Sequence, residues 1–202
     1  MRASPGMHPG GCQPLCKHPK SQESLPSTAY FLPPTPPMSS DATNAALRQV
    51  FPDLAFSQFR GQNRVVAPRG SIEAVLRLLK EKLGFDLLVD VTCVDYLYYA
   101  NARDRFGLVY LLANTQTNER ITVRTFVNDP DPEVPSVVHL WEGANWLERE
   151  AWDLFGIRFA GHPDLRRIVL PEQFTAHPLR KDYPLQGRGE RHNFPVIRRA
   201  EG

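Results

Sequence analysis

Residues 106–127 read FGLVYLLANTQTNERITVRTFV, which is two runs of β-forming residues separated by a short polar segment. The runs cover residues 106–113 and 120–127, and the polar residues 114–118 suit a hairpin loop. A third run of similar composition, residues 87–97, comes just before them. We therefore expect three consecutive strands that belong to one sheet.

The region before these strands adds two helices and two shorter strands. Residues 72–83 predict a helix that starts after Ser71, because their apolar side chains recur at helical spacing. The other expected elements are a helix at 41–50, strands at 54–59 and 64–67, and a turn at 61–63 between these strands. The order of helix, two strands, helix and three strands predicts an α+β fold, a two-layer α/β sandwich with a mixed sheet.

The last helical segment precedes a stretch without any periodic pattern. Residues 136–141 predict a short helix, and Asn145 is in position to cap a second helix that ends at Phe155. Glu148 stands three residues after Asn145, where a capping box places its carboxylate. From residue 160 onward we expect an extended C-terminal arm rather than a second core. The expected division is a proline-rich tail (1–40), an α/β domain (41–159) and the arm (160–202).

Charge divides the chain at nearly the same boundaries. The net charge of the whole chain is only +2, which argues against a protein that binds nucleic acid through a strong positive field. Residues 41–155 carry 12 basic and 16 acidic residues, whereas residues 156–202 carry 9 and 5. A basic arm on an acidic domain is typical of a segment that lies along another protein.

The N-terminal tail is rich in proline, with nine of the chain's 19 prolines in its first 38 residues. It shows no helical or strand periodicity and no apolar signal-peptide core, so we expect it to be disordered. Met38, just before the first expected helix, is our candidate for the true start of the protein; the alternative is that residues 1–37 form a dispensable tail. Four possible zinc ligands in the tail have a spacing that matches no common zinc finger; they are His8, Cys12, Cys16 and His18.

The sequence contains none of the common cofactor and catalytic motifs. It has no GxGxxG, no P-loop, no HExxH and no GxSxG. It has no CxxC pair either, which argues against an iron–sulfur cluster held by this chain alone. The longest apolar run, residues 107–113, is far shorter than the roughly 20 residues of a membrane helix.

Three acidic residues, Glu148, Glu150 and Asp153, lie close together in the last expected helix. One hypothesis is a carboxylate cluster for proton handling or metal binding. A simpler interpretation is structural, because acids near a helix start complement its dipole and Arg149 can pair with Asp153 one turn further on. All three tryptophans lie in the same region and fit either the domain's own core or a subunit interface; they are Trp141, Trp146 and Trp152.

Two histidines in the arm, His162 and His177, each precede a proline. A neutral histidine can act as a base or a metal ligand, and Asp164 or Asp182 could orient its ring. No nucleophile stands beside either histidine, which argues against catalysis by this chain.

Two long segments around this helix resemble a known signature. Residues 145–157, NWLEREAWDLFGI, and residues 159–167, FAGHPDLRR, resemble the signature of the C subunit of the proton-pumping NADH:quinone oxidoreductase, respiratory complex I. The segment HPLRKDYPL at 177–185 resembles the second hallmark of that family, and residues 135–137 and 140–141 also match. The resemblance covers about residues 41–186.

The resemblance implies a peripheral-arm subunit on the cytoplasmic side of the cell membrane, with the two-layer fold that the element order predicts. It implies that the chain carries no cofactor, while FMN, iron–sulfur clusters and quinone belong to the assembled complex. It also implies that the arm packs along the D subunit and near the B subunit of that complex. The chain is then a non-catalytic part of an NADH:quinone oxidoreductase that supports electron transfer from NADH to quinone.

The same resemblance points to a set of signature residues that we expect at the subunit interface. They are Trp146, Glu148, Arg149, Glu150, Asp153, Phe155, Gly156, His162, Pro163, Asp164, Leu165, Arg166, Arg167, His177, Pro178, Arg180, Lys181, Asp182 and Tyr183. We further hypothesise that four of the basic residues hold the arm against acidic or carbonyl groups of the partner; they are Arg166, Arg167, Arg180 and Lys181.

Three other functions stay open at this point. The chain could be the equivalent subunit of a related membrane-bound hydrogenase or NAD(P)H dehydrogenase complex. It could instead be a free metal-dependent hydrolase that uses His162 and His177 with nearby acids. A nucleic-acid binder that uses the basic arm is the third, and the balanced overall charge argues against it.

Overall fold

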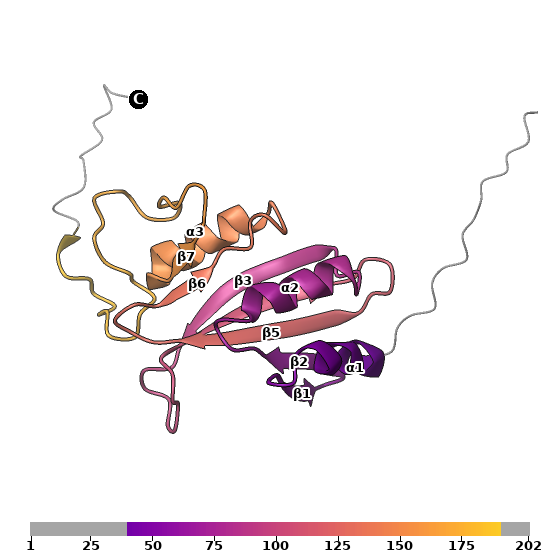
Figure 1. Ribbon diagram of the computed structural model, residues 1–202. Coiled ribbons are helices and arrows are strands. Elements are labelled where there is room, and N and C mark those ends of the chain that lie inside the picture. Colours follow the sequence, from indigo (N-terminus) through magenta and orange to yellow (C-terminus); the bar gives the residue numbers. More distant parts are fainter. Residues whose placement is uncertain (1–39, 191–202) are drawn as a thin grey trace, which may run out of the picture. The chain divides into compact units, whose positions relative to one another are not determined.

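The computed structural model describes residues 40–190 of the 202-residue chain. The candidate start at Met38 and the four possible zinc ligands of the tail lie outside these residues. Within them, the chain forms a five-stranded sheet, a two-stranded sheet and three helices, arranged as a two-layer α/β sandwich (Figure 1). The α+β fold class predicted from the element order is therefore confirmed.

The main sheet contains β1 (Ala55–Phe59), β2 (Gln62–Val66), β3 (Leu87–Asp95), β4 (Phe106–Ala113) and β5 (Arg120–Val127) in the order β1-β2-β5-β4-β3. The pair β2–β5 is parallel and the other neighbours are antiparallel, so the sheet is mixed as predicted. The predicted turn at 61–63 is wrong, because Gln62 already pairs with Phe59. The turn consists of Arg60 and Gly61, whose φ values of 50° and 77° suit a tight two-residue hairpin.

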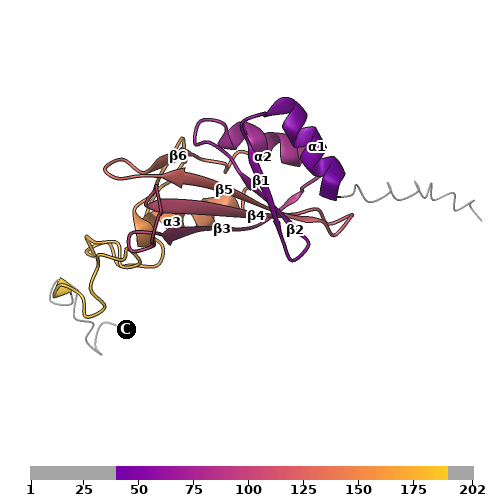
Figure 2. The same ribbon diagram turned by 90° about the horizontal axis from the view of Figure 1, so that it is seen from below.

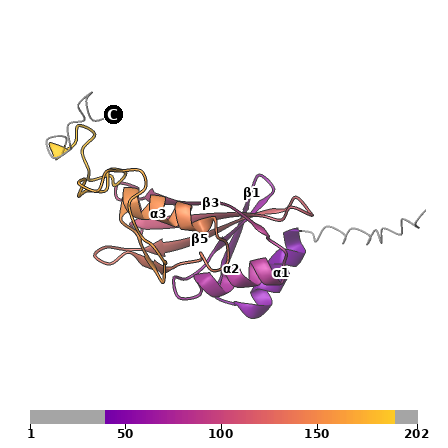
Figure 3. The same cartoon turned by 90° about the horizontal axis from the view of Figure 1, so that it is seen from above.

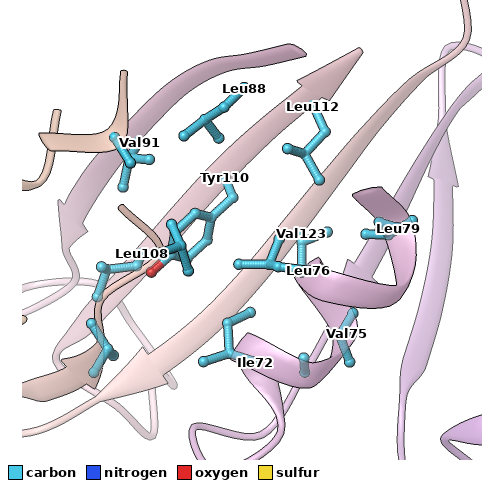
Figure 4. Close-up of a cluster of buried hydrophobic side chains, with 14 of the residues drawn as sticks. Ile72, Val75, Leu76, Leu79, Leu88, Val91, Leu108, Tyr110, Leu112 and Val123 are labelled. Carbon is cyan, nitrogen blue, oxygen red and sulfur yellow. The ribbon is translucent and has the colours of Figure 1, made fainter. Parts of the chain in front are cut away.

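Two helices, α1 (Ser40–Val50) and α2 (Ile72–Glu81), lie side by side on one face of this sheet (Figure 3). The apolar stripe predicted for the second helix is buried, with Ile72, Leu76 and Leu79 fully inaccessible to solvent. These side chains pack toward the alternate residues of β4 and β5 that point to the same side (Figure 4). Burial of this stripe accounts for the position of α2, since the hydrophobic effect is the main force that holds a helix on a sheet.

The opposite face of the main sheet carries no helix of residues 40–190. Seen from below, the strands lie in front of α3 and face the viewer (Figure 2). We call this side the open face. By register it carries Arg64 of β2, Val109 of β4, and Thr122, Arg124 and Phe126 of β5.

The third helix, α3 (Ala144–Phe155), lies beside the small parallel sheet of β6 (Glu133–Pro135) and β7 (Arg158–Ala160) (Figure 1). The short helix predicted at 136–141 is wrong, because the segment forms turns there and no α-helix. Ser136 instead follows β6 directly, and its backbone N–H donates to the carbonyl of Ala160. The long-range pairing of β6 with β7 therefore decides the path of this segment, and local capping preferences do not.

Beyond β7, residues 161–189 contain no α-helix and no strand. This part of the chain runs from the end of β7 along α3 and toward the end of the main sheet (Figures 1 and 3). Its course is set by hydrogen bonds to α3 and to the main sheet.

Candidate functional site

The signature segments meet at α3, which begins earlier than predicted. Ala144 is its first residue and Gly143 its N-cap, so Asn145 lies inside the helix and the predicted capping box is wrong. Glu148 is fully buried, and its two carboxylate oxygens accept hydrogen bonds of 2.7 Å from the Ser136 hydroxyl and the Val137 N–H. Burial raises the pKa of Glu148 to about 7, although both hydrogen bonds act in the opposite direction. Glu148 thus connects α3 to the segment after β6.

Asp153 holds the first part of the arm against α3. Its Oδ2 atom accepts hydrogen bonds from the backbone N–H groups of residues 168, 169 and 170 at 3.1, 2.9 and 2.9 Å. Its other oxygen accepts a hydrogen bond from the Arg167 guanidinium. Burial alone would raise the pKa of Asp153, but these donors outweigh burial and hold it below its usual value.

Arg149 also binds the arm. The predicted pair of Arg149 with Asp153 is wrong, because the Arg149 guanidinium donates to the carbonyls of Arg166 and Arg167 at 3.0 and 3.2 Å. It also lies 5.1 Å from the centre of the Trp146 ring. The arm supplies better acceptors to this arginine than the neighbouring turn of its own helix does.

The C-terminal end of α3 is covered by the second hallmark segment. The His177 Nδ1 atom donates to the Asp153 carbonyl at 2.9 Å, and the Leu179 N–H donates to the Leu154 carbonyl at 3.1 Å. The Arg180 Nε atom donates to the Phe155 carbonyl at 2.6 Å. These donors satisfy carbonyls that a helix end otherwise leaves unpaired, and the arginine charge complements the helix dipole.

Gly156 makes this close approach possible. Its φ is +76°, which favours glycine, and an added Cβ atom would lie 2.7 Å from two atoms of the His177 ring. The same Cβ atom would lie 2.9 Å from the Arg180 guanidinium. The glycine of the first signature and the histidine and arginine of the second therefore form one packed contact.

A third anchor lies at the end of the main sheet and centres on Arg105. Its guanidinium pairs with Asp95 at 3.3 Å, with Asp129 at 2.5 Å and with Asp182 of the arm at 2.8 Å. The buried Asp95 also accepts a hydrogen bond from the Lys181 N–H at 2.9 Å. Burial alone would raise the pKa of Asp95, but the Lys181 and Arg105 donors outweigh burial and lower it. Sequence reasoning missed Arg105 and Asp95, because no periodic or motif signal connects residues separated by 77 and 86 positions from their arm partners.

The histidines make structural contacts. The His162 Nδ1 atom accepts a hydrogen bond from the Asp164 N–H at 3.0 Å, and its Nε2 atom lies 3.3 Å from the Asn145 carbonyl. The carboxylate of Asp164 pairs with Arg166, and that of Asp182 with Arg105, so neither orients a histidine ring. Among residues 40–190 no group of three or more His, Cys, Asp or Glu side chains could hold a metal ion.

The signature residues divide into three groups by exposure. The acids Glu148 and Asp153 and the neighbouring Arg149 and Phe155 are buried within the chain. Most of the others are half-buried; these are Gly156, His162, Asp164, Leu165, Arg167, His177, Pro178, Arg180 and Tyr183. The exposed ones are Trp146, Glu150, Pro163, Arg166, Lys181 and Asp182. Exposed apolar side chains of the arm lie among them, namely Ile168, Val169, Leu179 and Leu185.

The tryptophans divide in the same way. Trp141 is buried in the core, and its Nε1–H donates to the Asp86 carbonyl at 3.0 Å. Trp146 is 61% exposed, although it lies in the middle of the signature. Exposed tryptophan and aliphatic side chains are characteristic of surfaces that bind other proteins.

Comparison with known families finds a family model that matches most of the described residues. Residues 65–189 match the family model described as "Respiratory-chain NADH dehydrogenase, 30 Kd subunit". This range includes the last two residues of β2, the strands β3 to β5, α3 and the described arm up to Gly189. In residues 40–190, no helix has the length and apolar character needed to span a bilayer.

Relatives named as the C subunit of NADH-quinone oxidoreductase are similar over most of their length. The protein from Trichlorobacter lovleyi is 48% identical over 136 residues, which is 67% of this chain and 83% of that protein. The protein from Laribacter hongkongensis is 40% identical over 164 residues, or 78% of this chain and 84% of the relative.

Two solved structures are similar in fold. A trypsin-resistant fragment of Nqo5 is 37% identical with a TM-score of 0.56, and the match covers 60% of this chain and 98% of the fragment. A chain of an archaeal membrane-bound sulfane sulfur reductase has a TM-score of 0.63 and covers 72% of this chain and 85% of its own length. Its 24% identity shows a shared fold alone. The family match and these relatives together show that this chain belongs to the family of the 30 kDa subunit of respiratory-chain NADH dehydrogenase, which is named the C subunit in bacterial NADH-quinone oxidoreductases.

Proposed function

We propose that this chain is a peripheral-arm subunit of a proton-translocating NADH:quinone oxidoreductase, where it acts as a scaffold. Family membership indicates the complex to which the chain belongs, and the arrangement of α3 and the arm supports a scaffold role within it. The single observation that carries the role is that the signature acids and bases hold the arm on α3. They bind backbone groups and each other, and they leave an apolar surface exposed beside them.

This surface is the proposed docking site for partner subunits. Its exposed apolar side chains include Trp146 of α3 and Val169 and Leu179 of the arm, with exposed fractions of 61%, 56% and 48%. Apolar side chains held on a fixed backbone lose little conformational entropy on binding, which favours tight association. We propose that the D subunit of the complex covers this surface and that the B subunit lies nearby.

The basic residues of the arm have different roles in this proposal. Arg167 and Arg180 already bind acceptors within the chain, so they position the arm. Arg166 and Lys181 are both exposed. Arg166 pairs with Asp164 at the surface, but its exposed guanidinium, like the Lys181 ammonium, can still reach acidic or carbonyl groups of a partner. The hypothesis that the arm's cations contact the partner is therefore kept for Arg166 and Lys181.

The proposed role requires no cofactor in this chain. FMN, iron–sulfur clusters and quinone would belong to other subunits of the assembled complex, and this chain would take part in the reaction as a non-catalytic subunit. The complex would hold it at the cytoplasmic side of the cell membrane as a peripheral protein. The equivalent subunit of a related hydrogenase or NAD(P)H dehydrogenase complex is the second candidate, and the relatives from NADH-quinone oxidoreductases favour the first.

Affinity purification of the tagged full chain from membranes in mild detergent tests the proposal. Subunits of an NADH:quinone oxidoreductase, including the one with the quinone-reducing module, should be recovered together with it. Recovery of a nickel–iron hydrogenase subunit would support the second candidate. A free chain that copurifies with no redox subunit would contradict both.

A further inference from the structure

The open face of the main sheet carries a group of arginines without acidic partners. Arg64 of β2 lies opposite Thr122 of β5, and Arg120 and Arg124 lie two residues to either side of Thr122 on the same strand. Arg60 extends the group at the hairpin turn. Within residues 40–190, none of these four arginines forms an ion pair.

Two of these arginines are held in place by an aromatic ring instead. The guanidinium carbons of Arg64 and Arg60 lie 4.4 and 5.3 Å from the centre of the Phe59 ring, which is itself 51% exposed. The Nε atom of Arg124 is buried without a hydrogen-bond partner in the described part of the chain. Because a buried guanidinium N–H without an acceptor is costly, this atom indicates that the open face lacks an acceptor group in the free chain.

The same face is hollowed around Phe126. Two hollows of about 290 and 280 Å³ adjoin there, and both are lined by Phe126 and Asp104. Gly107 makes room for this arrangement, because an added Cβ atom would lie 2.8 Å from the Tyr96 ring and 3.0 Å from the Phe126 ring. The open face therefore combines unpaired cations with depressions large enough for an apolar side chain.

We propose that the open face is a second docking surface, and that it binds an acidic segment of another protein that places an apolar side chain beside Phe126. Charge complementarity with the arginines favours this occupant. By register, Asp90 is the one acidic residue that the strands of the main sheet place on this face. An acidic segment would supply the carboxylates that the arginines lack.

The segments of the chain outside residues 40–190 fit this face poorly. Residues 1–39 carry three basic residues and one acidic residue, and residues 191–202 also carry three and one. Both are basic, so they would add repulsion to a face that is already positive. A nucleic acid fits less well, because it would bring phosphates to the arginines but no apolar side chain to the hollows beside Phe126.

The proposed surface lies on the opposite side of the main sheet from α3, so its test does not depend on how the arm docks. The test places a photoreactive phenylalanine analogue at Phe59 in the full chain, expressed in its native cells. A control probe replaces Glu81, which is exposed on α2. After irradiation of intact cells, mass spectrometry identifies the crosslinked peptide.

We expect the Phe59 probe, and not the Glu81 probe, to crosslink to a segment of another protein in which Asp and Glu outnumber Lys and Arg. The variants Arg120→Glu and Arg124→Gln should each lower the yield about tenfold or more, as expected when a charge pair loses one member. The matched control Arg77→Glu, on the helical side, should leave the yield unchanged. Arg120 is exposed, so that variant tests the charge without disturbing the core.

Several results would overturn the proposal. One is the absence of any crosslink. Another is a crosslink to something other than an acidic segment of another protein, namely a neutral or basic segment, lipid, nucleic acid, this chain itself or a second copy of it. The last is a crosslink yield that the arginine variants do not change.

Discussion

Replacement of Asp153 by alanine should release the arm from α3. The change removes the acceptor of three backbone N–H groups and the partner of Arg167, whose side chain is only 12% exposed. A buried donor left without an acceptor costs about 1–3 kcal/mol, and breaking one side of a buried ion pair costs about 3–5 kcal/mol. Local opening of the arm avoids these costs, because water can then replace the lost acceptor, so we expect the arm to open locally.

Hydrogen exchange at single residues measures this opening. We expect the amides of residues 168–170 to exchange at least about a hundredfold faster in Asp153→Ala, which corresponds to about 3 kcal/mol. The amides of β4 and β5 should keep their protection, because the core does not depend on Asp153. Glu150→Ala is the matched control, since Glu150 lies exposed on the same helix. Unchanged protection of residues 168–170 in Asp153→Ala would refute the anchoring role of this carboxylate.

Acid should mimic the substitution in the wild-type chain. Because the pKa of Asp153 is lower in the folded state than its usual 3.8, the stability that its ionised form contributes is present above that pH and lost below it. Protection factors of residues 168–170, corrected for intrinsic exchange, should therefore stay constant from pH 8 to pH 5 and fall only in stronger acid. A loss of protection near neutral pH would point to a different anchoring group.

Three further predictions concern the other anchors. Gly156→Ala should destabilise the contact between α3 and the arm by about 1–3 kcal/mol, through backbone strain and a clash with His177, and should therefore speed tryptic cleavage of the arm. The control Gly143→Ala should change neither, because an added Cβ atom there has no neighbour within 4 Å. Arg105→Met should lower the free energy of unfolding by about 3–5 kcal/mol in urea titrations because it leaves the buried Asp95 unpaired, and adding Asp95→Asn should recover part of the loss; no recovery would contradict the pairing. Folding raises the pKa of Glu148 from 4.5 to about 7, so the free energy of unfolding of the wild type should fall by about 3 kcal/mol as pH rises through this interval. Glu148→Gln should not show this fall; a variant whose stability changes with pH as that of the wild type does would refute the prediction.

Local patterns were sufficient to predict the main layers of the fold. The strands at 106–113 and 120–127 coincide with β4 and β5, and their loop joins them as an antiparallel pair. The apolar stripe from Ile72 to Leu79 is buried as its spacing predicts. In these segments, the hydrophobic period and the tertiary structure agree, so the sequence is informative.

The same reasoning failed where distant segments compete with local ones. Ser136 has the chemistry of a helix cap, but β6 pairs with β7 across 25 residues and Ser136 then binds Glu148. Arg149 stands one turn before Asp153, but the backbone of the arm offers both residues stronger partners. Such choices depend on which backbone groups the fold brings near, and a single sequence does not contain that information.

The family signature singled out a set of residues but did not indicate the role of each one. Glu148 and Asp153 were expected as capping or interface residues, and they are fully buried within the chain. Their carboxylates organise the segment after β6 and the arm, and Trp146 and Val169 remain exposed beside them. The interface role of the signature residues stays a prediction, which is most direct for the exposed ones.

The central claim is that α3 and the arm serve the assembly of the complex and take no part in its chemistry. The most direct measurement is the amount of assembled NADH:quinone oxidoreductase in membranes that carry Asp153→Ala or Glu148→Ala, together with the quinone reduction rate per assembled complex. We predict that the amount falls several-fold, while the rate per assembled complex stays close to that of the wild type. Normal assembly with lost quinone reduction would contradict the account.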